Sequence, residues 1–209
     1  MQLHAGRQRT ANVIRGPVLA LRGAARSVET IQDCFDLFFD ETIFERIITK
    51  TNMRINRHLD KLREHKKHIF ESSKYSWLKE TSYPEMRALK GLIYLRGLYG
   101  MNHRNIEFLF AKHIAHDIFG ATMSQQRMKF LLANITFDDP EERAQNWPSD
   151  RFAAARPLFE QFNKNCSKYV YPSEYLSLDE TLYPMRHQIA FRQYNPNKPH
   201  KYGLLVVFE

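Results

Sequence analysis

The 209-residue sequence predicts a mainly α-helical N-terminal domain, followed by the first β-strands of a second domain. From Thr30 to about Tyr169, apolar residues recur at steps of three to four residues, the period of an amphipathic helix. After Tyr171-Pro172 they alternate with polar residues instead, as they do in strands. The hydrophobic content of 43% is enough for a packed core and excludes a disordered chain.

Polar and glycine breaks divide the helical part into several predicted helices. Thr30 and Asp33 have the spacing of a helix-start box, and a break at Asp40–Glu41 begins a helix that reaches about His58. Later helices are predicted over Pro84 to about Gly100, Arg104 to His116, Ser124 to Leu132 and Arg156 to Tyr169. Asp138-Asp139-Pro140 predicts a turn, followed by a polar loop to Asp150.

Three strands are predicted in the C-terminal part: Leu176 to Leu182, Ile189 to Tyr194 and Tyr202 to Phe208. Two prolines in the loop 195–201 prevent regular pairing there. Three strands without a covering helix cannot bury a sheet face, so we expect this region to be the opening of a larger domain.

The chain is basic, and its charge is unevenly distributed. It has 31 Lys and Arg against 23 Asp and Glu, a formal net charge of +8, which favours polyanionic partners. Residues 1–28 contain five arginines and no acidic residue, and residues 50–74 contain a second basic cluster. Three interpretations of the first stretch stay open: an arm that binds phosphates, a mitochondrial transit peptide, or a solvated tail.

Composition also excludes several classes of protein. The apolar runs are far shorter than the ~20 residues that a membrane-spanning helix needs. Two cysteines, Cys34 and Cys166, are too few for a disulfide framework or a zinc ribbon. No secretory signal is visible in the first 30 residues. The sequence therefore predicts a reducing compartment, the cytosol or the nucleus.

Two groups of residues are candidates for metal binding. Asp179-Glu180 lies on a predicted strand, and carboxylates on rigid strands hold the paired divalent ions of enzymes that act on phosphodiesters. The alternative is a solvated charged pair at a strand end. His113, His116 and Asp117 share one predicted helical face, as metal ligands or simply as a polar surface.

Basic and aromatic residues alternate between Arg186 and Tyr202. The basic residues are Arg186, Arg192, Lys198 and Lys201, and the aromatic ones are Phe191, Tyr194 and Tyr202. No acidic residue lies between Arg186 and Phe208. This pattern is typical of a groove that neutralises phosphates and stacks on exposed bases, and a basic hairpin on a solvated surface is the alternative.

The most specific motif of the chain runs from Leu176 to Gly203. It reads Leu-Ser-Leu-Asp179-Glu-Thr-Leu-Tyr-Pro-Met-Arg186, then Phe191-Arg-Gln-Tyr194, then Pro196-Asn-Lys-Pro-His-Lys-Tyr-Gly203. Upstream segments are Phe35-Asp-Leu-Phe-Phe39 with Thr51-Asn52, Met123-Ser-Gln-Gln-Arg127, Phe137-Asp-Asp139 and Arg156-Pro-Leu-Phe159. Over about residues 30–208, the chain resembles the piggyBac transposase family.

The resemblance implies a fold and an activity. Residues 30–172 would be a helical dimerisation and DNA-binding domain, and residues 173–209 the incomplete start of an RNase H-like α/β core. Residues 1–29 lie outside the resemblance, and their composition predicts a basic, disordered arm. Family members cut and paste DNA, favour TTAA targets, and use three aspartates that hold two Mg²⁺ ions. The expected partners of this chain are therefore DNA and a second copy of the chain. We expect no association with a membrane and no small-molecule cofactor.

Individual residues match the motif of the family. Asp179 matches the first catalytic, metal-binding aspartate. By position, Arg186 and Lys201 match basic residues that lie near the DNA in that family. Arg192 and Lys198, from the same basic and aromatic segment, complete the expected DNA-binding residues. The chain departs from the pattern at His187-Gln188, where a Gly-Arg pair is usual, and at Leu205, where a lysine is common. Both changes weaken phosphate contacts.

The carboxylates after Asp179 decide what activity we expect of the chain. Only Glu180 and Glu209 follow it, and a lone aspartate cannot hold two divalent ions. We therefore expect a truncated, nuclear, DNA-associated protein derived from a piggyBac-like transposase and inactive by itself. A domesticated, non-catalytic DNA-binding or protein-interaction module stays open, as do cytoplasmic and mitochondrial locations.

Overall fold

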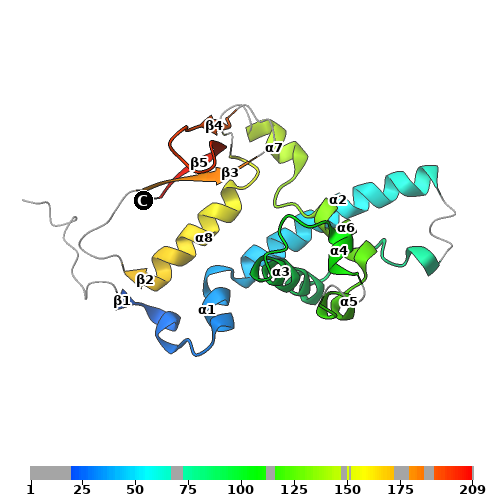
Figure 1. The fold of residues 1–209 in the computed structure, drawn as a ribbon, viewed down its shortest axis with the longest axis horizontal. Coiled ribbons are helices and arrows are strands. Elements are labelled where there is room, and N and C mark those ends of the chain that lie inside the picture. The colour runs from blue at the N-terminus through cyan, green and yellow to red at the C-terminus, as the bar shows by residue number, and fades with distance from the viewer. Residues whose placement is uncertain are drawn as a thin grey trace, which may run out of the picture. The chain divides into compact units, whose positions relative to one another are not determined.

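The computed structural model describes residues 20–66, 73–111, 116–146, 150, 152–171, 179–185 and 191–208. The chain forms two compact units (Figure 1). Phe39–Phe162 is the helical unit, and Met1–Phe38 together with Asn163–Glu209 form what we term the sheet unit. The predicted functional boundaries at residues 29 and 172 stay predictions.

The helical unit is built around one long helix. Its elements are α2 (Glu41–His65), η4 (Ser73–Tyr75), α3 (Tyr83–Leu98), α4 (Ile106–Leu109), α5 (Ile118–Thr122), α6 (Gln125–Asn134), α7 (Pro140–Asn146) and the start of α8 (Arg156–Tyr169). The side chains with the least exposed surface form the core: Ile43, Ile55, Leu89, Leu109, Phe119, Met128 and Leu131. None of the helices in the described ranges is long and apolar enough to cross a bilayer.

Side-chain caps confirm several predicted helix starts. The carboxylate of Asp40 accepts a 3.0 Å hydrogen bond from the amide of Ile43 at the start of α2. The hydroxyl of Ser124 accepts one of 3.2 Å from the amide of Arg127 in α6. Such caps satisfy amides that have no partner inside the helix.

Two helix predictions and one loop prediction differ from the structure. Helix α2 continues to His65 rather than ending near His58. Of the helix predicted over residues 104–116, the described residues form only the short α4. The polar loop predicted after Pro140 is wrong for residues 140–146, which form α7. Asp139 starts this helix, because its carboxylate accepts a 2.9 Å hydrogen bond from the Glu141 amide and Pro140 suits a first helical position.

The sheet unit combines helical and strand segments from both ends of the chain. Its elements are β1 (Ala20–Leu21), η2 (Gly23–Ser27), α1 (Ile31–Phe38), the end of α8, β2 (Val170–Tyr171), β3 (Asp179–Pro184), β4 (Gln193–Tyr194) and β5 (Tyr202–Phe208). The Thr30–Asp33 box that begins α1 is confirmed, since the Asp33 amide donates to the Thr30 hydroxyl at 3.1 Å. Strands β1 and β2 pair antiparallel, an association that the sequence did not predict.

The three strands predicted after residue 172 form one antiparallel sheet with the order β3-β5-β4. Strand β3 pairs with β5 from Asp179↔Phe208 to Pro184↔Gly203. Strand β4 is shorter than predicted, with two residues, and pairs Tyr194 with Tyr202. The helix-rich fold with a small antiparallel sheet is therefore confirmed. Residues 1–19 of the predicted arm lie outside the described residues, whereas residues 20–29 contain β1 and η2.

Candidate nucleic-acid interface

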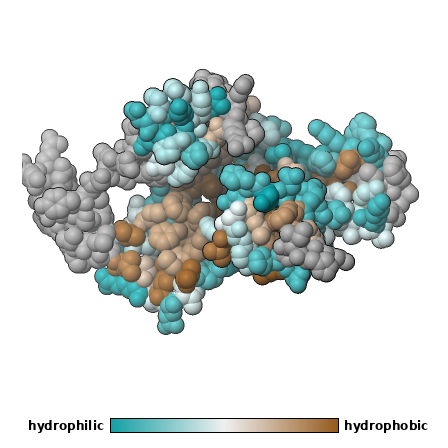
Figure 2. Space-filling view, in the orientation of Figure 1, coloured by the Kyte–Doolittle hydropathy of each residue, from teal (hydrophilic) through white to brown (hydrophobic). Residues whose placement is uncertain are grey.

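The C-terminal half of α2 carries a basic face. Arg54, Arg57, His58 and Lys61 have the spacing i, i+3, i+4 and i+7, which places them on the same side of a helix. The opposite side is fixed in the core by Ile55 and Leu59, which are 0% and 3% exposed. The visible surface of this end of α2, at the right of the view, is mostly hydrophilic (Figure 2).

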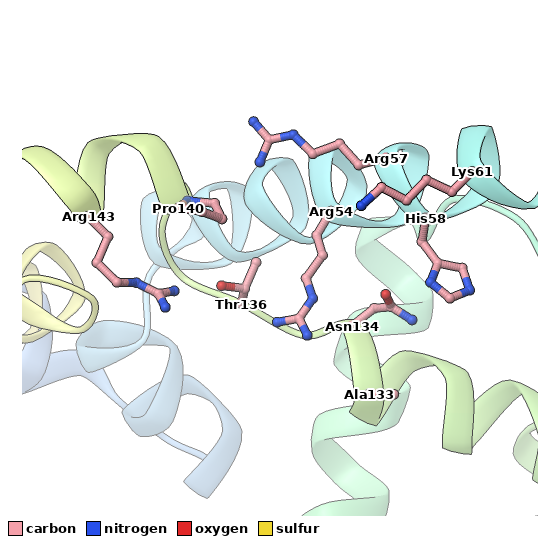
Figure 3. A pocket seen from close by; sticks show the side chains of 9 residues that line it. All are labelled: Arg54, Arg57, His58, Lys61, Ala133, Asn134, Thr136, Pro140 and Arg143. Carbon is pink, nitrogen blue, oxygen red and sulfur yellow. The ribbon is translucent and has the colours of Figure 1, made fainter. Parts of the chain in front are cut away.

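These side chains line a pocket of about 520 Å³, which we term the basic pocket. Its lining residues are Arg54, Arg57, His58, Lys61, Ala133, Asn134, Thr136, Pro140 and Arg143. Figure 3 shows the first four coming from successive turns of α2, with Arg143 reaching down from α7. The remaining residues belong to the end of α6, the segment that joins it to α7, and the first residue of α7.

Two buried carboxylates hold two of the arginines. Arg143 binds Asp138 through Nε–Oδ2 and Nη2–Oδ1 distances of 2.6 and 2.7 Å. Arg57 Nη2 lies 3.0 Å from Oδ2 of Asp139, and the two aspartate side chains are only 6% and 7% exposed. The hydroxyl of Thr136 also donates to Asp138 at 3.1 Å. The Arg57–Asp139 pair ties the segment before α7 to α2, and the contacts of Asp138 hold that segment to α7.

Arg54 and Lys61 differ from the other two cations of the basic pocket. Both are exposed, and no described residue gives either side chain a hydrogen bond or an ion pair. The pocket therefore has positive charge in excess of its own carboxylates. Cations placed at helical spacing around a concavity suit a ligand with repeated negative charges, such as a nucleic-acid backbone.

We predict that acid weakens the contacts that hold the segment before α7 in place. Hydrogen bonds from Arg143 hold the pKa of Asp138 below its usual value, and the Glu141 amide followed by Arg57 lowers the pKa of Asp139. A carboxyl with a lowered pKa stabilises the folded state above its unfolded-state pKa, and this is lost as the pH falls through the folded value. The contribution is therefore complete at pH 7, begins to fall near the unfolded-state pKa of about 4, and is lost only below the lowered folded-state pKa.

The variant Asp138→Asn tests this prediction in denaturant titrations at several pH values. It should be less stable than the wild type by about 1–2 kcal/mol at pH 7, and the difference should shrink in acid. Asp60→Asn is the control, since the Asp60–Arg63 pair is exposed on both sides. A difference between Asp138→Asn and wild type that stays constant down to pH 3 would contradict the prediction.

Asp179, the predicted catalytic and metal-binding residue, is the first residue of β3 and pairs with Phe208. The described residues contain no group of three or more His, Cys, Asp or Glu side chains able to hold a metal ion. Of the predicted histidine cluster, His116 stacks on Tyr99 with ring centroids 3.8 Å apart, and His113 lies outside the described residues.

The predicted DNA-binding residues fall on the β4–β5 hairpin. Arg192 lies with its guanidinium carbon 4.7 Å from the ring centroid of Tyr202. Lys198 and Lys201 lie in the turn between the strands, which is closed by a 2.8 Å hydrogen bond from the Asn195 amide to the carbonyl of Lys201. The structure thus brings Arg192 and the two lysines to one hairpin. Arg186 lies outside the described residues.

The net charge of the basic segment does not reveal the basic pocket. The signal in the sequence is the spacing of Arg54, Arg57, His58 and Lys61, which places them on one helical face. The partners that close the pocket come from 82 residues further along, as for Arg57 and Asp139. Nothing in the local sequence pairs them.

Comparison with known proteins gives a consistent result. A family model described as "Transposase IS4" matches residues 30–208. The human "PiggyBac transposable element-derived protein 3" is 24% identical over 176 residues, which cover 84% of this chain and 26% of that protein. The human "PiggyBac transposable element-derived protein 2" is 23% identical over 176 residues, covering 82% and 26%.

A solved structure is similar over most of the chain. The cryo-EM structure of a piggyBac transposase synaptic complex with hairpin DNA matches with a TM-score of 0.78 and 26% sequence identity. The match covers 90% of this chain and 37% of the transposase chain. This chain thus spans about a quarter of the length of the two human relatives and just over a third of that transposase.

Proposed function

Because the chain belongs to the piggyBac family of transposases, we propose that it is a transposase-derived protein that associates with duplex DNA. The observation that carries this proposal is the basic pocket, where Arg54 and Lys61 have no counter-charge among the described residues. Lysine and arginine side chains that neutralise phosphates release counterions, and this release supplies most of the affinity of sequence-independent DNA binding. The nucleus is the proposed location.

The β4–β5 hairpin is the second proposed DNA contact. Lys201 is exposed, and Arg192 and Lys198 are half-buried. No acidic residue between Arg186 and Phe208 competes for these cations within the hairpin. Phosphate contacts position a protein on DNA but do not identify the bases. We therefore expect duplexes with and without a TTAA site to bind this chain equally well.

We assign no catalytic step to this chain. As the family relationship suggests, the sheet β3-β5-β4 is proposed to be the first part of an RNase H-like core, with Asp179 as a ligand for Mg²⁺. A two-metal site needs several carboxylates, and the described residues offer no such group. Association with DNA is the function that the residues of this chain support.

The experiment is a salt series of duplex DNA binding with the 209-residue chain. The logarithm of the binding constant should fall linearly with the logarithm of salt concentration. Replacing both Arg54 and Lys61 by glutamine should weaken binding and reduce the magnitude of the slope by about two, because each lost phosphate contact removes about one unit. Fluorescence anisotropy with a labelled duplex measures both quantities.

The matched control removes the same charge from the same helix. Arg63 and Lys66 lie at the end of α2, are exposed, and do not line the basic pocket. The double variant Arg63→Gln, Lys66→Gln should keep a slope close to that of the wild type. If both double variants lost the same amount of DNA affinity, the net charge of the chain, and not the basic pocket, would be the cause of binding. Duplex binding that is absent, or insensitive to salt, would overturn the proposed function.

A further inference from the structure

The β4–β5 hairpin presents aromatic rings to solvent beside its basic residues. Tyr194 and Tyr202 are directly paired across the two strands, so both side chains lie on the same face of the sheet. Tyr183 belongs to this face as well, because it pairs with Leu204, two residues along β5 from Tyr202. The three tyrosines are 50–55% exposed, so this face of the sheet presents aromatic surface to solvent.

The geometry of the pair leaves ring surface available. The ring centroids of Tyr194 and Tyr202 are 4.8 Å apart and the rings are inclined by 43°, so they do not cover each other in a parallel stack. The Arg192 guanidinium carbon lies 4.7 Å from the centroid of Tyr202 and adds a cation to the cluster. Because about half of each side chain is exposed, both rings keep surface on which another planar group can stack.

The charge around the rings indicates what this planar group is. Lys201 is exposed next to Tyr202, and Lys198 lies in the same turn. Residues 187–208 contain no acidic residue. A surface for an apolar protein partner would not need such an excess of positive charge, whereas aromatic rings flanked by cations bind the bases and phosphates of single strands.

From this arrangement we propose that Tyr194 and Tyr202 form a stacking platform for unpaired DNA bases, with Arg192, Lys198 and Lys201 on the adjoining phosphates. The inference rests on the proposed function and adds a preference for unpaired nucleotides. A duplex has its bases stacked internally, so it can use the cations of the hairpin but not the rings. Base–aromatic stacking tolerates any sequence, because every base has a π-face.

The stacking platform lies near the end of β3 that is opposite to Asp179. Gly203, next to Tyr202, pairs with Pro184 at one end of β3, and Asp179 is at the other end. Five steps along a strand span about 17 Å. The platform would hold a base roughly that far along the sheet from the Asp179 position.

The test compares three labelled probes bound to the full chain: an oligothymidylate, the same oligonucleotide with abasic sites, and a duplex of equal length. Tyr194→Ala and Tyr202→Ala should each weaken oligothymidylate binding by about 5- to 150-fold, the range that alanine substitution of stacking residues gives. Duplex binding should change little. The wild type should bind the abasic strand as weakly as the alanine variants bind the intact one.

Conservative and remote variants separate stacking from loss of fold. Tyr194→Phe and Tyr202→Phe keep the rings and should bind like the wild type. Tyr94→Ala, which removes a 60% exposed tyrosine from α3, is the matched control and should have no effect.

Four results would overturn the platform: alanine variants that are folded and bind oligothymidylate normally, phenylalanine variants as weak as the alanine ones, an abasic strand that binds as well as the intact one, or duplex binding without any single-strand binding. The last result leaves the proposed function intact. A chain that binds no probe overturns both proposals.

Discussion

Replacing Arg127 with methionine is expected to destabilise the helical unit by about 3–5 kcal/mol, the range found when one partner of a buried ion pair is removed. Arg127 is 4% exposed, although arginine is rarely buried in proteins. Urea unfolding followed by the helical circular dichroism signal measures the loss.

The expected size of this effect follows from the number of groups that the guanidinium satisfies. Nη1 donates to the carbonyl oxygens of Trp77 and Lys79, each at 2.7 Å. Nη2 donates to the carbonyl of Glu80 at 2.8 Å. Nε and Nη2 also bind the two carboxylate oxygens of Glu85 at 2.7 and 2.6 Å. Methionine fills the space but leaves three carbonyls and a carboxylate without their donor.

The pH dependence of the loss identifies the ion pair as its cause. Partial burial acts to raise the pKa of Glu85, but hydrogen bonds from Arg127 and Thr81 outweigh it and hold this pKa below its usual value. The stabilisation is therefore present above the unfolded-state pKa and is lost as the pH falls through the folded one. Wild type and Arg127→Met should converge partially in acid.

A control variant distinguishes this buried contact from a simple change of charge. Arg54→Met removes one positive charge from an exposed position and should change stability by no more than about 0.5 kcal/mol. Arg127→Lys should recover little stability, because an ammonium group cannot reproduce the planar fork of donors. If Arg127→Met proved as stable as Arg54→Met, the role assigned to Arg127 would be wrong.

The helix that contains Arg127 is predictable from the sequence, but the hydrogen-bond partners of Arg127 are not. Ser124 caps this helix, and Arg127 belongs to a segment that resembles the family. Both are local patterns of neighbouring residues. The acceptors of Arg127 lie 42 to 50 residues earlier in the chain, and three of them are backbone carbonyls. Every residue type has the same backbone carbonyl, so the sequence does not indicate which carbonyls accept hydrogen bonds from Arg127.

The candidate DNA-binding residues differ in the same way. The placement of Arg192, Lys198 and Lys201 on one hairpin is predictable, because these residues are close together in the sequence. The basic pocket is not predictable, because it needs the 138–143 segment to lie against α2. Asp138-Asp139-Pro140 suits a turn as well as the start of a helix, so the local pattern does not reveal α7.

Gly203→Ala is expected to disrupt the three-stranded sheet. A Cβ atom at this position would lie 2.1 Å from the carbonyl oxygen of Tyr183 and 2.8 Å from its carbonyl carbon. Both atoms belong to the backbone of β3, so no side-chain rotation can relieve the clash and the strand must move. Crowding of this kind costs about 1–3 kcal/mol, and a displaced backbone can cost more. We expect the amides of β5 to lose protection from hydrogen exchange.

Substitution of a second glycine is the control, and its expected effect on stability has the opposite sign. Gly91 lies within α3, and a Cβ atom there would meet nothing within 4 Å. Gly91→Ala should stabilise the protein by about 0.5–1 kcal/mol, because alanine loses less backbone entropy in a helix than glycine does. The close contacts at position 203 explain why the motif has a glycine after Tyr202. Gly203 permits β3 and β5 to approach, and the pairing of these strands places Tyr183 and Tyr202 on one face. If Gly203→Ala kept full protection of the β5 amides, this explanation of the glycine would be wrong, and the shared face of the tyrosines would need another cause.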